Sequence, residues 1–214
     1  MPGNGHQPPP IFAASVDEAE PEKRRAILHA AVKVFAEKGY HGCRIADVAR
    51  QAGVAYGLVY HYFRNKDALL ESVFAEQWTI FINALQAIAD GPGTAPEQLA
   101  GVCRFAIDVF RTAPAAVRVL LLEVARTSDA FRGGSKRQTF EQAVRIVAGV
   151  VRRGQERGEI RRDVSPELAA AGLLGALELT LTGMVIGLLG ASSDDVERVK
   201  MGVIDLVLSG VAAR

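Results

Sequence analysis

The sequence is poor in the residues that most catalytic and metal sites use. It has two cysteines, Cys43 and Cys103, too few for a disulfide framework or a cysteine-based zinc cluster, and this low content suits a reducing compartment. It has four histidines, and none follows His61. The motifs H-E-x-x-H and G-x-S-x-G and a phosphate-binding loop are also missing. We therefore expect no catalytic residue, no metal and no cofactor, and we predict that the protein is not an enzyme.

The sequence also has little that would direct it to a membrane. Residues 1–20 contain no Lys or Arg, and their only apolar run is Ile11–Val16, so they do not form a signal peptide. We predict a disordered tail over 1–20 and a cytoplasmic protein. Residues 169–191 are apolar and long enough to span a bilayer, but Glu178 lies at their centre and five glycines dilute them. A buried helix is the favoured interpretation, and a membrane helix is the alternative.

Strand patterns are missing as well, because no run of β-branched or aromatic residues alternates with period two. Apolar residues instead recur at the spacings i, i+3, i+4 and i+7 of amphipathic helices. Asn65 and Ser165 are typical N-caps, and Gly39 and Gly53 follow helical segments as C-caps. We predict an all-α protein of about nine helices, over approximately 21–38, 45–51, 56–63, 65–89, 94–112, 114–127, 136–157, 166–190 and 194–211.

The small net charge of +1 hides an uneven distribution. Residues 21–66 hold nine Lys or Arg and three acids, whereas residues 1–20 and 67–214 are mildly acidic. A compact basic block beside an acidic remainder suggests a nucleic-acid-binding domain on a body with another role. The alternative is a helical subdomain with a solvated basic face.

Residues 43–62, CRIADVARQAGVAYGLVYHY, have the pattern of a helix-turn-helix motif. Two short helices meet at a turn around Gly53, and the second is short enough to lie in the major groove. Gly57 is a poor helix former inside that second helix, and close approach to a phosphate backbone would explain it. The hydroxyls of Tyr60 and Tyr62 are suitable phosphate ligands. Both tyrosines could instead serve packing, and His61 could be a solvated side chain.

Residues 23–74 resemble the N-terminal domain of the TetR family of transcriptional regulators, including GV-x-x-G-x-x-Y-x-[YH]-F and the following N-K-[DE]-x-L. The resemblance implies a homodimer that binds a palindromic DNA operator through residues 21–66. It also implies that residues 67–214 bind a small effector that releases the DNA, so the family default is a repressor. The implied phosphate contacts are Arg44, Tyr60, Tyr62 and Lys66, and the implied base contacts are Ala55, Tyr56, Gly57 and His61.

Two positions depart from the family pattern. Cys43 stands where the family often has Thr or Ser as a helix cap, and a thiol caps poorly. Ser is common where Ala55 stands, so base contacts would fall more on Tyr56, His61 and Arg44.

The last two predicted helices correspond to those with which TetR-like proteins pair their subunits. The first of them is apolar on more than one side, as a helix must be when it packs on its own core and on a partner. Its small residues permit close helix approach: Ala171, Gly175, Gly183 and Gly187. The resemblance thus implies a four-helix bundle between two chains, and a monomer with a thick core is the alternative.

The effector pocket implied by the resemblance would lie among the helices of the body. The candidate effector-binding residues are Trp78, Phe81, Phe105, Phe110, Glu123, Glu178 and Met184. The apolar ones could equally be plain core. We expect Glu178 to be buried in its apolar helix, and a buried carboxylate needs a partner or a function. The possible partners are Arg118, Arg126 and Arg145, and Glu123 raises the same question.

Two segments of the body, EVARTSDAF and RGQERGEIRRDVSPELAAAGLLGALE, resemble regulators of fatty-acid degradation within the TetR family. This resemblance implies an acyl-CoA or another lipophilic effector. Its phosphates would lie near basic residues such as Arg152, Arg153, Arg161 or Arg162. A small helical enzyme or a helical adaptor that does not bind DNA, either one using the C-terminal cavity, is the alternative function.

Overall fold

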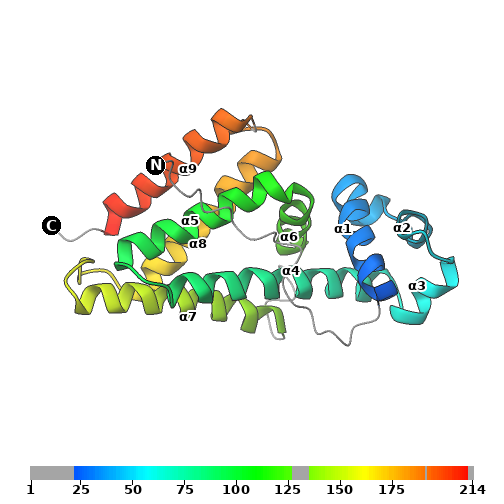
Figure 1. Cartoon of the computed structure of the whole chain (residues 1–214), viewed down its shortest axis with the longest axis horizontal. Coiled ribbons are helices and arrows are strands. Elements are labelled where there is room, and N and C mark those ends of the chain that lie inside the picture. The colour runs from blue at the N-terminus through cyan, green and yellow to red at the C-terminus, as the bar shows by residue number, and fades with distance from the viewer. Residues whose placement is uncertain (1–21, 127–134, 191, 212–214) are drawn as a thin grey trace, which may run out of the picture. The chain divides into compact units, whose positions relative to one another are not determined.

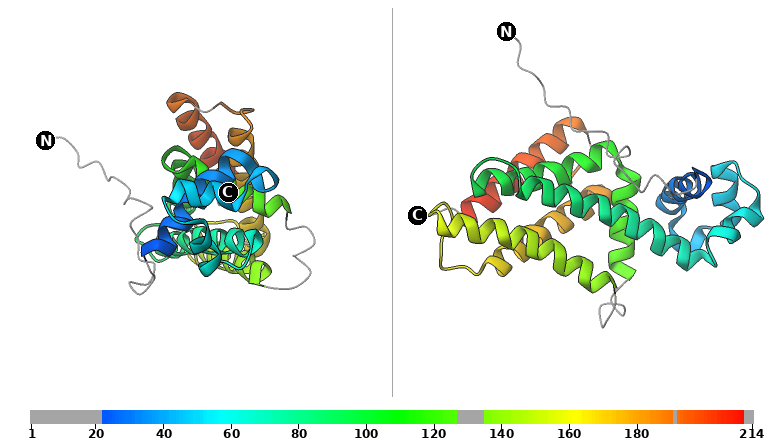
Figure 2. Two further views of the ribbon diagram at one scale, coloured as in Figure 1. Left: turned by 90° about the vertical axis from the view of Figure 1, so that its right-hand side faces the viewer. Right: turned by 60° about the horizontal axis from the view of Figure 1, so that its bottom comes forward.

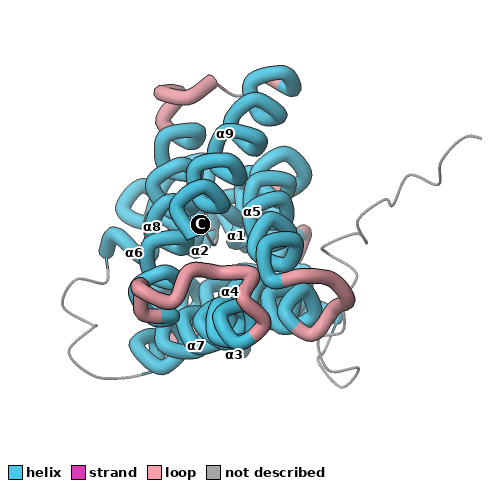
Figure 3. The backbone as a smooth tube through the Cα atoms, turned by 90° about the vertical axis from the view of Figure 1, so that its left-hand side faces the viewer, coloured by secondary structure: helices cyan, strands magenta, loops and turns pink. Residues whose placement is uncertain are grey.

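The structure is a computed structural model that describes residues 22–126, 135–190 and 192–211. For residues 122–126 and 135–136 it describes the backbone only. Every regular element in these ranges is a helix, as Figure 3 shows, and the predicted all-α fold with nine helices is confirmed for the described residues. The predicted tail over 1–20 lies outside the described residues.

The chain divides into two compact units, with the division after Val73. The first unit contains α1 (Glu22–Gly42), α2 (Ile45–Ala52), α3 (Tyr56–Tyr62) and the first residues of α4 (Lys66–Ala89). Helix α1 buries an apolar stripe that includes Ile27 and Phe35, and α2 packs on it. Packing of this kind stabilises α2 and α3, which have eight and seven residues and are too short to be stable alone.

Local sequence signals set most helix ends. The Oδ1 atom of Asn65 accepts the N–H of Ala68 at 2.8 Å, and the Oγ atom of Ser165 accepts the N–H of Leu168 at 3.0 Å. Gly39 has the positive φ of 65° that was expected at the end of α1, although one further turn follows it to Gly42. These caps confirm the predicted starts of α4 and α8 and the break in α1.

The eighth helix is shorter than predicted. Helix α8 (Pro166–Val185) ends five residues before the expected position near Gly190. Gly187 has a φ of 77°, its N–H donates to the Met184 carbonyl, and the N–H of Leu188 donates to the Gly183 carbonyl at 2.8 Å. The chain turns back on the last turn of the helix there, because glycine adopts a positive φ without steric cost.

The second unit contains the rest of α4 together with α5 (Ala95–Thr112), α6 (Pro114–Arg126), α7 (Ser135–Glu156), α8 and α9 (Ser193–Val211). Figures 1 and 2 show α7 along α8, and α5 packed on α9. One apolar core, with contributions from α4, α5, α7, α8 and α9, fills the space between them. Leu85, Ile107 and Val147 are completely buried in it.

An ion pair links α9 to α5 inside this unit. The side chain of Lys200 is mostly buried, and its Nζ atom donates to Asp108 and to Glu197, each at 2.7 Å. Burial alone lowers the pKa of Lys200, but the two carboxylates outweigh that effect and raise the pKa above its ordinary value. The ammonium therefore stays charged when folded, and it depends on Asp108 for its link to α5.

We predict that Asp108→Ala lowers the free energy of unfolding by about 1–3 kcal/mol, because it removes one partner of a mostly buried ammonium. Glu156→Ala, at an exposed position of α7, is the control and should change it by less than about 0.5 kcal/mol. Urea unfolding measures both. A raised pKa stabilises the fold below the ordinary lysine pKa, so the stabilisation should persist at neutral pH and disappear only in alkali. Equal stability of the two variants at pH 7 would contradict this.

Candidate DNA-binding surface and effector site

Helices α2 and α3 meet at a tight turn. Gly53 adopts the left-handed conformation, with φ 66° and ψ 31°, and its N–H donates to the Arg50 carbonyl at 3.2 Å. The N–H of Val54 donates to the Ala49 carbonyl at 3.0 Å. Val48 on α2 and Val59 on α3 are completely buried. The turn and the two valines together fix the angle between the helices, which is the geometry of a helix-turn-helix motif.

The opposite face of α3 is exposed. Ala55, Tyr56, Gly57, Tyr60 and His61 are all exposed, with Tyr56 at 53% and Tyr60 at 45%. The Tyr56 hydroxyl donates to the Tyr60 hydroxyl at 3.3 Å, and the two rings meet edge to face. Packing into the core therefore does not account for Tyr60. A short helix with such a face has the size and chemistry to contact base edges and phosphates.

Tyr62 differs from Tyr60, because its side chain is half-buried. Its ring lies edge to face against His61, with 5.1 Å between ring centroids, and 6.4 Å from the ring of Phe63. Packing accounts for part of this side chain, so both interpretations of Tyr62 remain open.

Gly57 is not required by the protein itself. A Cβ atom built on it would meet nothing within 4 Å, and its φ is not positive. The open space lies on the exposed face of α3. Packing within the protein thus does not explain the glycine at this position.

Arg44, not Cys43, occupies the N-cap position of α2. Cys43 is buried, and desolvation raises the pKa of its thiol. The carboxylate of Asp47 accepts the backbone N–H of Arg44 at 3.1 Å and supplies the stabilisation that a thiol could not. Hydrogen bonds from Lys38 and from the Arg44 N–H lower the pKa of Asp47. The guanidinium of Arg44 is exposed and available for a phosphate.

Lys66 has a different environment from the one that a phosphate contact implies. Its Nζ atom donates to the carbonyl of Tyr40 at 2.7 Å and to that of Cys43 at 3.0 Å. The same ammonium lies 4.2 Å from the centroid of the Tyr40 ring. The Tyr40 hydroxyl in turn donates to Asp67 at 2.6 Å. Lys66 thus holds the end of α1 and the start of α2 on α4, and only one of its three N–H groups is left for DNA.

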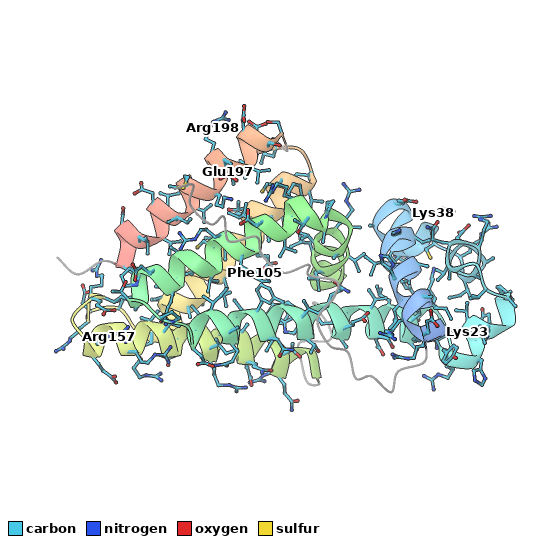
Figure 4. The ribbon with its side chains drawn as sticks, in the orientation of Figure 1. Lys23, Lys38, Phe105, Arg157, Glu197 and Arg198 are labelled. Carbon is cyan, nitrogen blue, oxygen red and sulfur yellow. The ribbon has the colours of Figure 1, made fainter. Side chains whose placement is uncertain are left out.

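The body gathers several predicted effector residues into one aromatic cluster. The ring centroid of Trp78 lies 5.6 Å from that of Phe74, 5.4 Å from that of Phe81 and 4.7 Å from that of Phe140. Phe105 points from α5 toward α4 (Figure 4), where it stacks on Phe81 at 6.1 Å. Phe74 and Phe140 were not among the predicted residues. Phe74 stands four positions before Trp78 and could have been found by helical spacing, whereas Phe140 lies on α7.

The other predicted effector residues lie elsewhere or outside the described side chains. Met184 is buried in the core, and Phe110 is half-buried against it. The side chain of Glu123 is not described. Glu178 was expected to be buried, but it is exposed on the face of α8 that also carries Leu179. In the single chain its carboxylate needs no buried arginine partner, so that premise was wrong.

The four arginines expected near effector phosphates each have a partner already. Arg152 pairs with Glu167, and Arg161 pairs with Asp163. Arg153 and Arg162 donate to backbone carbonyls, at 2.8 Å and 3.0 Å. Their role at an effector phosphate stays a prediction. Two grooves run along α7, one of about 470 Å³ lined by residues that include Arg137, Phe140 and Arg145, and one of about 430 Å³ that shares Arg145.

Two family models match the chain. Residues 27–73 match the bacterial regulatory proteins of the tetR family, and residues 96–172 match the tetracyclin repressor-like C-terminal domain. The fold and the exposed α3 define a helix-turn-helix protein with a separate helical body. The chain belongs to the TetR family of ligand-responsive, DNA-binding transcriptional regulators.

Several relatives regulate fatty-acid metabolism. The chain is 30% identical to the fatty acid metabolism regulator protein of Bacillus subtilis over 189 residues, which cover 88% of this chain and 95% of that protein. The crystal structure of FadR from Bacillus subtilis in complex with stearoyl-CoA has a TM-score of 0.73 at 29% identity, covering 87% and 98% of the two chains. The fatty acid degradation regulator FadR from Bacillus halodurans has a TM-score of 0.80 at 24% identity, covering 92% and 100%. These relatives are transcriptional regulators, not enzymes.

We predict that Gly57→Ala has opposite effects on folding and on DNA binding. The new methyl group should stabilise α3 by about 0.5–1 kcal/mol, since alanine is the better helix former and meets no protein atom. Operator binding should weaken about tenfold, the equivalent of roughly 1.4 kcal/mol. Thermal unfolding and fluorescence anisotropy with labelled DNA measure the two effects. Gly149→Ala on α7 is the control, with a similar gain in stability and unchanged DNA affinity.

We also predict that Lys66→Ala and Arg44→Ala act by different routes. Lys66→Ala should lower the free energy of unfolding by about 1–3 kcal/mol, because two carbonyls lose a charged donor. Arg44→Ala should leave stability unchanged and reduce the slope of log affinity against log salt by about 1. Salt titrations of operator binding, with unfolding curves of the same samples, test both. Unchanged stability of the Lys66 variant would contradict the structural role.

Proposed function

We propose that this protein is a homodimeric repressor that binds a palindromic operator in the bacterial cytoplasm and is released by an acyl-CoA or a related lipophilic effector. The proposed DNA contacts are Arg44, Ala55, Tyr56, Gly57, Tyr60, His61, Tyr62 and Lys66. The observation that carries the proposal is the exposed face of α3. It combines two tyrosines with Gly57, where a side chain would meet no protein atom within 4 Å.

The distribution of exposed apolar side chains supports a dimer through α8 and α9. Apart from Tyr56 and Tyr60, every exposed large apolar residue in the described ranges lies on α8, on α9 or between them. The most exposed are Leu206 at 76%, Leu188 at 75% and Leu179 at 74%. Such a patch on a single chain indicates a contact with another molecule. Two copies joined there would present two α3 helices to two half-sites of a palindrome.

The same helix raises the membrane alternative. Helix α8 is the one helix in the described part of the chain whose length and composition would allow it to cross a membrane. Ala170, Leu173 and Leu177 on one side of α8 are buried in the core of the second unit. Family membership and this packing favour a dimer over a membrane helix. Pairing of two chains would cover the exposed side of α8.

The proposed effector rests on the body and on its relatives. Trp78, Phe81 and Phe105, three of the predicted effector residues, lie in one aromatic cluster on the main core. The Bacillus subtilis relative was crystallised with stearoyl-CoA. An apolar aromatic surface suits an acyl chain, because burying each CH₂ group contributes about 0.8 kcal/mol. The alternative function is a helical enzyme or an adaptor that does not bind DNA. Selection of preferred DNA sequences distinguishes this alternative from a DNA-binding repressor.

The central experiment selects preferred sequences from a random pool of DNA duplexes. Wild-type protein should recover a palindromic consensus, and Arg44→Ala should recover it with lower affinity. The second arm adds acyl-CoA thioesters of increasing chain length to the operator complex. DNA release and thermal stabilisation should both increase with chain length, with about 2.7 kcal/mol of stabilisation at one hundred times the dissociation constant. Recovery of no consensus by protein freed of ligand would reject the DNA-binding proposal, and chain-length-independent stability would reject the effector.

We predict that Leu179→Asp converts the dimer to a monomer and weakens operator binding. An exposed leucine becomes a carboxylate that would be desolvated in the dimer, whereas the fold of the single chain should stay unchanged. Light scattering after size exclusion should give the monomer mass of 22.9 kDa for the variant and twice that mass for wild type. Gln138→Asp, at an exposed position on α7, is the control and should remain dimeric. A dimeric Leu179 variant would exclude this face as the interface.

A further inference from the structure

The protein has one tryptophan, and its indole N–H is buried. The side chain of Trp78 is 9% exposed, and its Nε1 atom has no hydrogen-bond partner in the part of the chain that the structure describes. Leaving such a donor unsatisfied costs about 1–3 kcal/mol. Buried polar groups are nearly always paired in native proteins, so this one requires an explanation.

The neighbours of Trp78 do not provide an acceptor for its N–H. Phe74, Phe81 and Phe140 surround the indole, with ring centroids 4.7–5.6 Å away. Phenylalanine rings are apolar and offer no strong acceptor, and the indole itself is a donor only. A phenylalanine at position 78 would keep an aromatic contact here without leaving an unsatisfied donor. The N–H is therefore the feature that distinguishes tryptophan at this place in the cluster.

The aromatic cluster lies next to a shallow, open groove on the surface of α7. Phe140, the nearest of the three rings, also lines the groove of about 470 Å³ on α7. Arg137 and Arg145 line the same groove, and both pair with Glu141. The surroundings of Trp78 thus combine an apolar cluster, a single unused donor and an accessible side. A ligand suited to them is apolar along most of its length and carries a hydrogen-bond acceptor.

We propose that the indole N–H of Trp78 donates a hydrogen bond to the carbonyl oxygen of an acyl effector. The inference rests on the proposed function and adds the group on the effector that is recognised. The acyl chain supplies affinity by burial, and the carbonyl supplies specificity because it satisfies a donor that is otherwise unpaired. Compounds that lack this oxygen bury the donor without an acceptor and bind more weakly.

The experiment compares two ligands that differ at one atom. Dodecanoyl-CoA has a thioester carbonyl, and S-dodecyl-CoA is the thioether without it. Because Trp78 is the sole tryptophan, intrinsic fluorescence reports directly on its indole in the wild-type protein. The thioester should bind about tenfold more tightly than the thioether. Calorimetry should then show that Trp78→Phe removes most of this preference while retaining affinity for the thioether.

Phe105→Leu is the matched control, because it alters the same cluster and keeps the indole N–H. It should weaken both ligands and leave their ratio near tenfold. Circular dichroism and operator affinity establish that each variant is folded. An unchanged ratio in Trp78→Phe would overturn the inference and leave the effector proposal intact. Failure of both ligands to bind wild-type protein that still binds its operator would overturn the proposed effector and this inference together.

Discussion

A single ammonium group sets the geometry on which the DNA-binding unit depends. The Nζ atom of Lys66 joins the carbonyls of Tyr40 and Cys43, the points at which α1 ends and α2 begins, to the first residue of α4. With α2 held there, the turn at Gly53 and the buried Val59 determine which face of α3 is turned outward. That arrangement places Tyr56, Tyr60 and Gly57 on the exposed face. The recognition surface is therefore a consequence of packing on its opposite side.

In the helical body, burial of apolar surface is incomplete on one helix, α8. Each helix of an all-α protein must bury an apolar stripe, and α8 has more apolar surface than its own chain can cover. One side of it packs in the core, and the other side, with Leu179, is exposed. Glu178 lies on that exposed side, which is why its position in an apolar run does not imply a buried charge. The excess surface suits pairing with a second copy, the arrangement that family membership implies.

The aromatic cluster connects the apolar core with the proposed ligand chemistry. An acyl chain needs apolar surface, which a helical core provides without any specific polar contact. The indole N–H of Trp78 would add specificity, because it is a polar group among apolar rings and has no acceptor among the described residues. The arginines of α7 and of the following loop are engaged with carboxylates or carbonyls, so charge alone does not mark the site. Specificity would then come from one donor in an apolar environment.

Features that depend on neighbours within a few residues could be predicted from the sequence. Helical spacing predicted the all-α fold, Asn65 and Ser165 marked two helix starts, and the motif over 43–62 predicted two short helices with a turn at Gly53. Tertiary structure alone decided that Phe140 meets Trp78, that Lys66 binds two carbonyls and that Glu178 is exposed. Caps and periodicity act along the chain, so they are visible in it. Burial and pairing depend on how helices far apart in sequence pack, and no local pattern encodes that.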